Sequence, residues 1–416
     1  MFNLSKSGAA YIDRLSVFLN EHVVPAEARV DRDGELVTGW VSESILPELR
    51  ETARQMDLYL PQMPAEYGGQ AVDLPTLMYA AELSAPWRLG PLALNCMAPD
   101  EGNMHLLLTF GTEIQKEMWL RPIAEGRMRS CFAMTEPDAG SDPSRLKSRA
   151  DRQDDGTWVI NAHKVFTSSA FGADLAVVMV VTDSEIGAHQ GQSMFLVPTD
   201  TPGFKIVRDI ATMGAHGFGG HTETTFTDVV VGPEAILGEL GQGFAIAQSR
   251  LGVGRLGHAM RWIGVAQYAL DLAAKRALSR ETFGAPLSDR QAIQWWLADG
   301  LTKLFAARLM VLHTCQLIEA GLPHRTQVAM VKSYTSELYC EIVDHALQVF
   351  GGWGYTKDFP IEAYYRDARA TRIFDGPNEV QRMLVARHLF KAVAIEGTTA
   401  RLSNVFDLPT PVIGRL

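Results

Sequence analysis

The chain has 416 residues, 47% of them apolar, and a formal charge of −10 from 38 basic and 48 acidic residues. This size and apolar content predict two or three globular domains and exclude a disordered chain. The acidic balance argues against a general nucleic-acid-binding protein, because that affinity comes mainly from neutralising phosphates. No apolar run approaches the roughly 20 residues needed to span a bilayer, so we expect no membrane span.

The first residues and the cysteines indicate the expected cellular compartment. The first residues lack the apolar core of a signal peptide and the Arg-rich, acid-poor pattern of a transit peptide. The four cysteines are scattered and form no CxxC pair. We therefore expect reduced thiols, no metal site and a cytoplasmic protein. The cysteines are Cys96, Cys131, Cys315 and Cys340.

Residues 1–128 are expected to form a mostly helical domain. Apolar residues recur at helical spacing near the start of the chain. Residues 111–126 are typical of a helix closed by Gly126, and a turn at 64–69 interrupts the region. The early apolar positions, with one histidine among them, are Leu15, Phe18, Leu19, His22 and Val23.

Residues 129–235 change to short β-rich runs separated by Gly, Pro and Asp, which predicts an antiparallel β domain. The runs are 157–160, 175–181, 194–197, 205–207, 222–226 and 229–231.

Residues 236–395 return to a helical pattern and predict a four-helix-bundle domain, with a loose tail at 396–416. The expected class is thus α+β, in the order helical, β, helical. One apolar helix face consists of Ile263, Ala266, Ala269, Leu270 and Ala273.

A G-x-G-x-x-G string at Gly252, Gly254 and Gly257 fits the dinucleotide fingerprint. That fingerprint requires a preceding strand and an acidic residue about 20 positions later. Neither is present at the required place, so we interpret the glycines as sites of close helix approach.

The segment 131–142 could grip a flat polar ring or a phosphate. Thr135, Ser141 and the backbone N–H groups around Gly140 supply donors beside a turn, although the residues alone favour an ordinary Asx-rich turn. The string Thr-Glu-Pro-Asp-Ala-Gly-Ser-Asp resembles the flavin loop of acyl-CoA dehydrogenases. This resemblance implies that Phe132, Met134 and Thr135 lie along the isoalloxazine ring of FAD, and that Ser141 contacts the flavin phosphate side and the thioester.

The segment 158–169 is similar to the family's strand and turn beside the flavin. Phe166 takes the position usually held by Trp, and Ser168 that of a flavin-bonding Thr. Aromatic packing on the ring suits either residue, and by itself the segment also fits a core strand with a surface turn.

Two further strings resemble family motifs. Arg280, with Phe283 and Gln291, matches Arg-x-x-Phe-Gly-x-x-Leu-x-x-x-Gln. Gln348, with Gly351 and Gly352, matches Gln-x-x-Gly-Gly-x-Gly. The resemblance implies that both sets reach the flavin of a neighbouring subunit, which implies a homotetramer built as a dimer of dimers. A guanidinium suits pyrophosphate because it offers paired donors.

The string Ile-Phe-Asp-Gly-Pro-Asn-Glu-Val at 373–380 matches the segment that carries the catalytic base. Most members have Glu where this chain has Asp375, so the resemblance assigns Asp375 as the base. It places Arg255 near that base, where a cation favours the ionised carboxylate, and it places Pro377 and Glu379 beside the cofactor. Asp is one methylene shorter than Glu.

An Asp-Gly-Pro-x-Glu-Val string is typical of a subgroup of the family, members ten and eleven and their bacterial relatives. The chain shares other strings with this subgroup, at 95–104, 168–169, 216–221 and 252–255. His216 and His221 also suggest a metal site, but no Cys or carboxylate set accompanies them. We interpret their glycine-rich segment as the border of the active site.

The resemblance implies FAD-dependent α,β-desaturation of an acyl-CoA, in which Asp375 takes the α-proton and flavin N5 the β-hydride. It also implies electron-transfer flavoprotein as the electron acceptor. Two alternatives stay open: a flavin oxidase or monooxygenase on the same fold, and a non-catalytic subunit of a hetero-oligomer. The sequence does not specify the length, branching or hydroxylation of the acyl chain.

Overall fold

The protein is described by a computed structural model that covers residues 4–33, 45–213, 220–396, 398–399 and 402. The chain divides into two compact units. The bundle unit consists of Met1–Gly8, Asp73–Pro86 and Arg255–Leu416, and the sheet unit of Ala9–Val72 and Trp87–Gly254.

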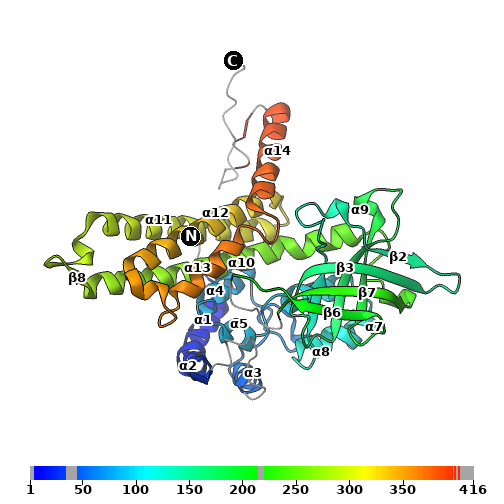
Figure 1. Ribbon diagram of the computed structural model, residues 1–416, viewed down its shortest axis with the longest axis horizontal. Helices are drawn as coiled ribbons and strands as arrows, with labels where there is room; N and C mark the ends of the chain where they lie inside the picture. Colours follow the sequence, from blue (N-terminus) through cyan, green and yellow to red (C-terminus); the bar gives the residue numbers. More distant parts are fainter. Residues whose placement is uncertain (1–3, 34–44, 214–219, 397, 400–401, 403–416) are drawn as a thin grey trace. The chain divides into compact units, whose positions relative to one another are not determined.

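A seven-stranded sheet forms the centre of the sheet unit (Figure 1). Its order is β1-β4-β2-β3-β7-β6, and β5 pairs with β4. The two long strands β3 and β7 pair antiparallel along most of their length. The strands are β1 Ser130–Ala133, β2 Arg149–Arg152, β3 Trp158–Ser168, β4 Leu175–Val181, β5 Gln192–Pro198, β6 Phe204–Asp209 and β7 His221–Val231.

Burial follows the side-chain periodicity of each strand. In β3 buried and more exposed positions alternate for most of its length, as expected when one face of a strand packs on the core. Strands β4 and β5 are apolar and buried almost throughout, because both of their faces are covered. Trp158, Phe195 and Phe226 are among the largest side chains of this core.

The sheet differs from the predicted one in two respects. It is mixed, because β1 pairs in parallel with β4, which the long connection between them permits. The strands are also longer than predicted: the run at 157–160 extends to Ser168, and the runs at 222–226 and 229–231 form one strand. A register shift in the β3–β7 pairing and a positive φ of 50° at Asp228 accompany this join.

Helices form the remainder of the sheet unit. Leu15, Phe18, Leu19 and Val23 are buried as predicted. The helix predicted at 111–126 begins at a capping box between Thr112 and Gln115 and ends before Gly126, whose φ is 77°. The elements are α1 Lys6–Phe18, η1 Leu19–Val23, α2 Val24–Asp33, α3 Ile45–Gln55, η2 Ala65–Tyr67, α5 Leu89–Ala93, α6 Asp100–Phe110, α7 Glu113–Gln115, η3 Lys116–Leu120, α8 Arg121–Ala124, η4 Pro143–Arg145, α9 Ala188–Gly191 and η5 Pro233–Ala235.

Long helices dominate the bundle unit, where α12 packs against α11, α13 and α14. The predicted apolar face at 263–273 is buried. The glycines at 252, 254 and 257 lie inside one helix, α10, and not between a strand and a helix. The elements are α4 Leu74–Ser84, α10 Gly243–Ser279, β8 Glu281–Thr282, β9 Ala285–Pro286, η6 Leu287–Asp289, α11 Gln291–Glu319, α12 Arg325–Phe350, η7 Gly351–Tyr355, α13 Ile361–Thr371 and α14 Asn378–Glu396. The residues of α10 up to Gly254 belong to the sheet unit.

The prediction that no segment is long and apolar enough to cross a membrane is wrong for α11. Its 29 residues include an 18-residue stretch of mean hydropathy 1.2, and 28% of that stretch is buried. The sequence prediction missed it because isolated charges interrupt the apolar residues. Length and composition alone are weak evidence for a span, since the core helix of a water-soluble bundle passes the same test.

Two sequence predictions fall largely or wholly outside the described residues. Apart from residues 396, 398, 399 and 402, the tail at 396–416 is not described, and neither is His216 of the 216–221 string. The boundaries after residues 128, 235 and 395 stay predictions.

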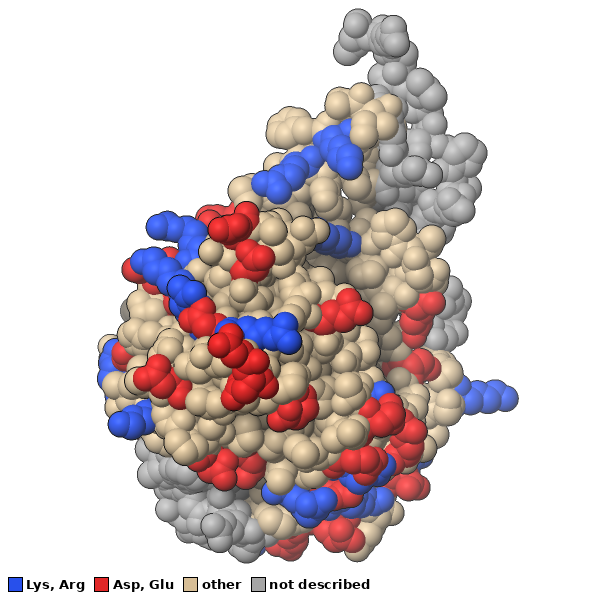
Figure 2. Space-filling model, turned by 90° about the vertical axis from the view of Figure 1, so that its right-hand side faces the viewer, with Lys and Arg blue, Asp and Glu red and all other residues tan. Residues whose placement is uncertain are grey.

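Acidic and basic side chains are interspersed on the face drawn in Figure 2. In the sheet unit, Glu223 on β7 pairs with Arg208 at 2.7 Å and with His163 at 2.7 Å. Such exposed pairs contribute little to stability.

A buried ion pair fixes the loop after β1. Lys164 on β3 is fully buried and lies 2.8 Å from Glu136. It also donates to the carbonyl oxygens of Met134 at 3.0 Å and Met179 at 2.7 Å. Glu136 accepts from the backbone N–H groups of Lys147 and Ser148, so this pair ties four segments of the sheet unit together.

We predict that Lys164→Met destabilises the protein by about 3–5 kcal/mol, because it leaves the Glu136 carboxylate buried and unpaired. The double variant Lys164→Met/Glu136→Gln is expected to recover most of that loss, since neither remaining group is charged. Chemical denaturation followed by tryptophan fluorescence measures both. Equal stability of the single and double variants would contradict the prediction.

Candidate active site

Asp375 lies in the loop between α13 and α14, in a backbone conformation that most residues avoid. Its φ is 55° and that of the following Gly376 is 86°. Asp is several-fold enriched among non-glycine residues at positive φ, and glycine adopts it without strain. The Asp-Gly pair therefore allows the chain to turn sharply at this position.

Two side chains hold the loop through its backbone oxygens. Arg255 on α10 donates from Nε to the carbonyl oxygen of Asp375 at 2.8 Å. Gln381 on α14 donates to the carbonyl oxygens of Asp375 and Gly376, each at 3.3 Å. A β-carbon on Gly376 would lie 2.6 Å from Nε2 of Gln381, so a larger residue here would displace the amide that holds the loop.

A buried lysine anchors the start of α14. Lys332 on α12 is fully buried and donates to Oδ1 of Asn378 at 2.9 Å. Ser336, one turn further along α12, also bonds to Asn378. Burial lowers the pKa of Lys332 to about 8, and the charge of Asp375 acts in the opposite direction.

A histidine faces the carboxylate itself. Nε2 of His258 lies 3.3 Å from Oδ2 of Asp375, and the two side chains are 24% and 19% exposed. The imidazole stacks on Trp262 with a centroid distance of 6.0 Å and meets Phe374 edge-on at 5.7 Å. The carboxylate is thus partly buried and partly accessible.

Arg255 lies close to the candidate base, as the resemblance implied, but it donates its hydrogen bond to the backbone oxygen of Asp375 and not to the carboxylate. Burial lowers the pKa of Arg255, and the charge of Asp375 opposes that shift. A guanidinium stays protonated in proteins, so Arg255 adds a positive charge beside the loop.

In the sheet unit the predicted flavin-loop residues lie together around β1. Phe132 is on β1, and the guanidinium of Arg250 lies 4.2 Å from the centre of its ring. The backbone oxygens of Met134 and Thr135 bond to Lys164 and to the N–H of Val165. Among the described residues, none hydrogen-bonds to the hydroxyl of Thr135 or of Ser141. Thr135 lies beside Gly140, whose β-carbon position is 3.6 Å from Cγ2 of Thr135.

Phe166 and Ser168 lie near the end of β3. Phe166 is 56% exposed although it is aromatic, and its φ is 55°. Ser168 bonds through Oγ to Nδ1 of His221 at 2.8 Å. An exposed aromatic ring next to hydroxyl groups fits a flat ligand with a polar edge, so these residues fit a flavin ring.

The other predicted cofactor residues form a separate group at one end of the bundle unit. The ring of Trp296 on α11 stacks on that of His345 on α12 at 4.9 Å, so the start of α11 lies beside the end of α12. The guanidinium of Arg276 near the end of α10 lies 5.9 Å from the ring of Phe350. This bundle-end group consists of Arg280, Phe283, Gln291, Gln348, Gly351 and Gly352.

The bundle-end group is exposed. Phe283 is fully exposed, with a φ of 50°. The side chains of Arg280 and Gln348 have no hydrogen-bond partner in the part of the chain that the structure describes. Arg280 is 22 residues beyond His258, roughly 33 Å along a helix. Arg280 and Asp375 therefore cannot both touch one flavin ring.

Pro377 and Glu379 stand on either side of Asn378 at the start of α14. Glu379 is exposed, whereas Glu136 is buried in its ion pair with Lys164. Burial raises the pKa of Glu136, but the charge and hydrogen bond of Lys164 outweigh it and hold that pKa below its usual value. Glu136 therefore has a structural role and is a poor candidate for the base.

Sequence reasoning missed four residues around Asp375. His258 and Trp262 follow Arg255 at i+3 and i+7 of α10, which puts all three on one helix face. That spacing could have revealed them. Lys332 and Gln381 carried no such signal.

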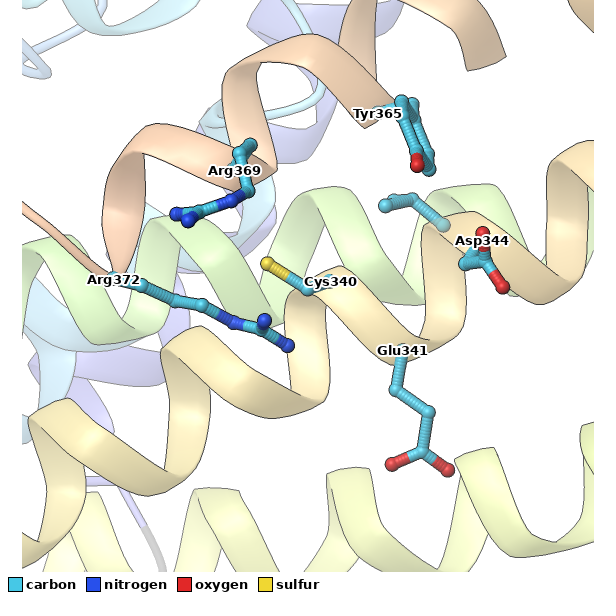
Figure 3. Close-up of a pocket in the computed structure, with 7 residues that line it drawn as sticks. Cys340, Glu341, Asp344, Tyr365, Arg369 and Arg372 are labelled. Atoms are coloured by element: carbon cyan, nitrogen blue, oxygen red, sulfur yellow. The ribbon is translucent and has the colours of Figure 1, made fainter. Parts of the chain in front are cut away.

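A separate cavity of about 250 Å³ lies between α12 and α13 (Figure 3). Cys340, Arg369 and Arg372 are among its lining residues, and none of the predicted site residues is. Burial raises the pKa of the Cys340 thiol, so it is a weak nucleophile. We assign this cavity no part in the candidate site.

Comparison with known proteins shows the family. The family models described as the N-terminal, middle and C-terminal domains of acyl-CoA dehydrogenase match residues 7–127, 131–229 and 241–390. The chain is 39% identical to the "probable acyl-CoA dehydrogenase FadE2" of Mycobacterium tuberculosis, over 93% of this chain and 96% of that protein.

It is also 36% identical to acyl-CoA dehydrogenase family member 11 of Gallus gallus, over 93% of this chain but only 51% of the relative. The chain thus spans about half the length of that relative.

Solved structures agree. Butyryl-CoA dehydrogenase from Megasphaera elsdenii has a TM-score of 0.82 and 31% identity, with 94% of this chain and all of that chain covered. The protein PigA, solved with FAD and proline, shares the fold at a TM-score of 0.80 and 23% identity, over 94% of this chain and 99% of PigA. The predicted fold class, with helical, β and helical domains, is confirmed. The chain therefore belongs to the acyl-CoA dehydrogenase family, and it is an oxidoreductase with FAD as its cofactor.

Proposed function

We propose that the protein catalyses α,β-desaturation of an acyl-CoA thioester, with Asp375 as the base that removes the α-proton. The observation that carries this proposal is the state of Asp375. Its carboxylate is partly accessible, and its loop is held by Arg255 and Gln381. A general base must present a lone pair in a fixed position, and this arrangement provides one.

The backbone of Asp375 supplies a second function. Among the described residues, none accepts a hydrogen bond from its N–H. A donor at this position can bond the thioester carbonyl oxygen, on which negative charge grows as the α-proton leaves. FAD, when bound, accepts the hydride from the β-carbon. Phe132, Met134, Thr135, Phe166 and Ser168 would hold its ring, since they combine apolar surface with hydroxyl groups.

Two partners follow from the proposal. One is electron-transfer flavoprotein as the electron acceptor; in support, the chain resembles a solved structure named "Electron transferring flavoprotein of Acidaminococcus fermentans", with a TM-score of 0.82 and 32% identity over 94% of this chain and all of that chain. The other is a second copy of the chain, because Arg280, which belongs to the exposed bundle-end group, lies too far along α10 to touch the same flavin ring as Asp375. Homotetramer assembly and a cytoplasmic location stay predictions.

We predict that Asp375→Asn retains FAD and binds acyl-CoA but reduces its flavin about 10²–10⁴-fold more slowly, because an amide cannot accept the proton. Stopped-flow bleaching of the flavin under anaerobic conditions measures this rate. Asp358→Asn, on the exposed turn before α13, serves as a matched control. If Asp375→Asn matched the parent rate, Asp375 would not be the base and Glu379 would be tested next.

The Glu variant tests the fit of the shorter acid. Asp375→Glu keeps a carboxylate but adds a methylene and places Glu at a φ of 55°, which Glu adopts less readily than Asp. We expect a rate between those of the parent and the Asn variant in the same assay. A rate no higher than that of Asp375→Asn would show that the position of the carboxylate matters as much as its presence.

Arg280→Ala is expected to lower FAD occupancy of the purified oligomer, because the pyrophosphate of the neighbour's FAD would lose the paired N–H donors of the guanidinium. Arg152→Ala, an exposed arginine on β2, is the control. Flavin absorbance per chain and light scattering give occupancy and assembly together. A flavin-loaded monomer at micromolar concentration would refute the shared site.

A further inference from the structure

One face of α10 points three side chains at the Asp375 loop. Arg255, His258 and Trp262 are spaced at i, i+3 and i+7, so they lie on one side of the helix. Arg255 donates to the backbone oxygen of Asp375. The next residue on this face, His258, faces the carboxylate, with 3.3 Å between Nε2 and Oδ2.

The orientation of the imidazole is fixed by its neighbours. Its plane lies 18° from that of Trp262 and 65° from that of Phe374, and Trp262 and Phe374 also contact each other at 5.9 Å. A ring packed against two aromatic rings is restrained in its rotation. Nε2 is therefore held toward Oδ2.

The protonation of Nε2 follows from this geometry. An ionised carboxylate only accepts hydrogen bonds, and a bare imidazole nitrogen also only accepts. The two atoms attract each other only if Nε2 carries a proton, either as the neutral Nε2–H form or as imidazolium.

We propose that His258 is a positioning residue for the candidate base, an inference that rests on the proposed function. Its Nε2–H donates to Oδ2 of Asp375 and fixes the plane of the carboxylate. Oδ1, which bonds to no protein group among the described residues, is then the atom that takes the α-proton of the acyl chain.

The charge of His258 would also make the rate of proton abstraction depend on pH. When His258 is protonated, its positive charge lies beside the carboxylate and opposes transfer of the α-proton to it. As pH rises through the pKa of His258, that charge is lost and proton abstraction speeds up. Other charges near this loop come from Arg255 on α10, from Arg325, Lys332 and Glu337 on α12, and from Glu379 on α14. Because these charges also affect the rate, only the part of the pH–rate profile that is lost when His258 is replaced is assigned to His258.

Two variants separate positioning from packing. His258→Phe keeps an aromatic ring but removes the donor. His258→Gln keeps an N–H near the position of Nε2 but cannot become charged. We expect His258→Phe to lower the rate of flavin reduction about 10–100-fold, as for loss of a hydrogen bond to a charged group. His258→Gln should recover most of that rate near the pH optimum and lose the pH-dependent rise.

The control is His189→Phe. His189 on α9 also contacts an aromatic ring, that of Phe244 at 4.4 Å, but lies in the sheet unit. FAD content and acyl-CoA dissociation constants are measured for every variant, so that a loss of folding is not read as a loss of chemistry. Equal losses in the Phe and Gln variants, or no loss in either, would overturn the proposal.

A second measurement needs no substrate. The parent holoenzyme and its Asp375→Asn variant are labelled with ¹⁵N-histidine, and the imidazole of His258 is identified by its loss in His258→Gln. We expect the pKa of His258 to fall in Asp375→Asn, because the neighbouring negative charge is removed. An unchanged titration would show that the two groups do not interact.

The rate measurements and the titration test the proposed function and the role of His258 separately. If no acyl-CoA reduces the parent flavin, the proposed function fails, while the titration still decides whether His258 and Asp375 interact. If the parent turns over and the titration or the variant rates go against the prediction, only the role of His258 fails.

Discussion

A fully buried lysine fixes the candidate functional loop in each of the two units. Lys164 holds the segment after β1 through Met134 and Glu136, and Lys332 holds the start of α14 through Asn378. An ammonium group is costly to bury unless its donors are satisfied. The chain meets that cost with a carboxylate and carbonyl oxygens in one unit and with an amide oxygen in the other. Each lysine connects segments that are distant in sequence, and these hydrogen bonds fix the positions of the loops.

The two buried lysines differ in whether the nearby carboxylate is bound to them. Around Lys164 the carboxylate of Glu136 is fully used, since it accepts from Lys164 and from two backbone N–H groups. Lys332 instead donates its hydrogen bond to the amide oxygen of Asn378. Asp375 interacts with the lysine charge electrostatically but does not hydrogen-bond to it. A carboxylate locked in a buried ion pair cannot exchange protons easily. Of these two carboxylates, that of Asp375 is not held in a buried ion pair, and it is the one able to act as a base.

The sequence specified the elements whose pattern is local. The apolar face at 263–273 and the all-apolar strand β4, Leu175–Val181, were both predicted where they occur. The predicted strand at 157–160 was shorter than β3, because a lysine such as Lys164 is typical of the surface. Its burial is possible only through its ion pair with Glu136, 28 positions away in sequence. Asp375 was found from its neighbours in sequence, whereas Lys332 was not, because its role depends on Asn378, 46 positions later. Long-range polar pairing is therefore what single-sequence patterns did not reveal.

The atoms of Asp375 show how its loop could serve proton abstraction. The backbone oxygen accepts from Arg255 and Gln381, and Oδ2 faces His258. Among the described residues this leaves one acceptor, Oδ1, and one donor, the backbone N–H, without a protein partner. Removing a proton next to a thioester carbonyl needs one acceptor for the proton and one donor for the carbonyl oxygen. Because both belong to one residue in a sharp, left-handed turn, the distance between them is set by that residue and not by the packing of separate elements.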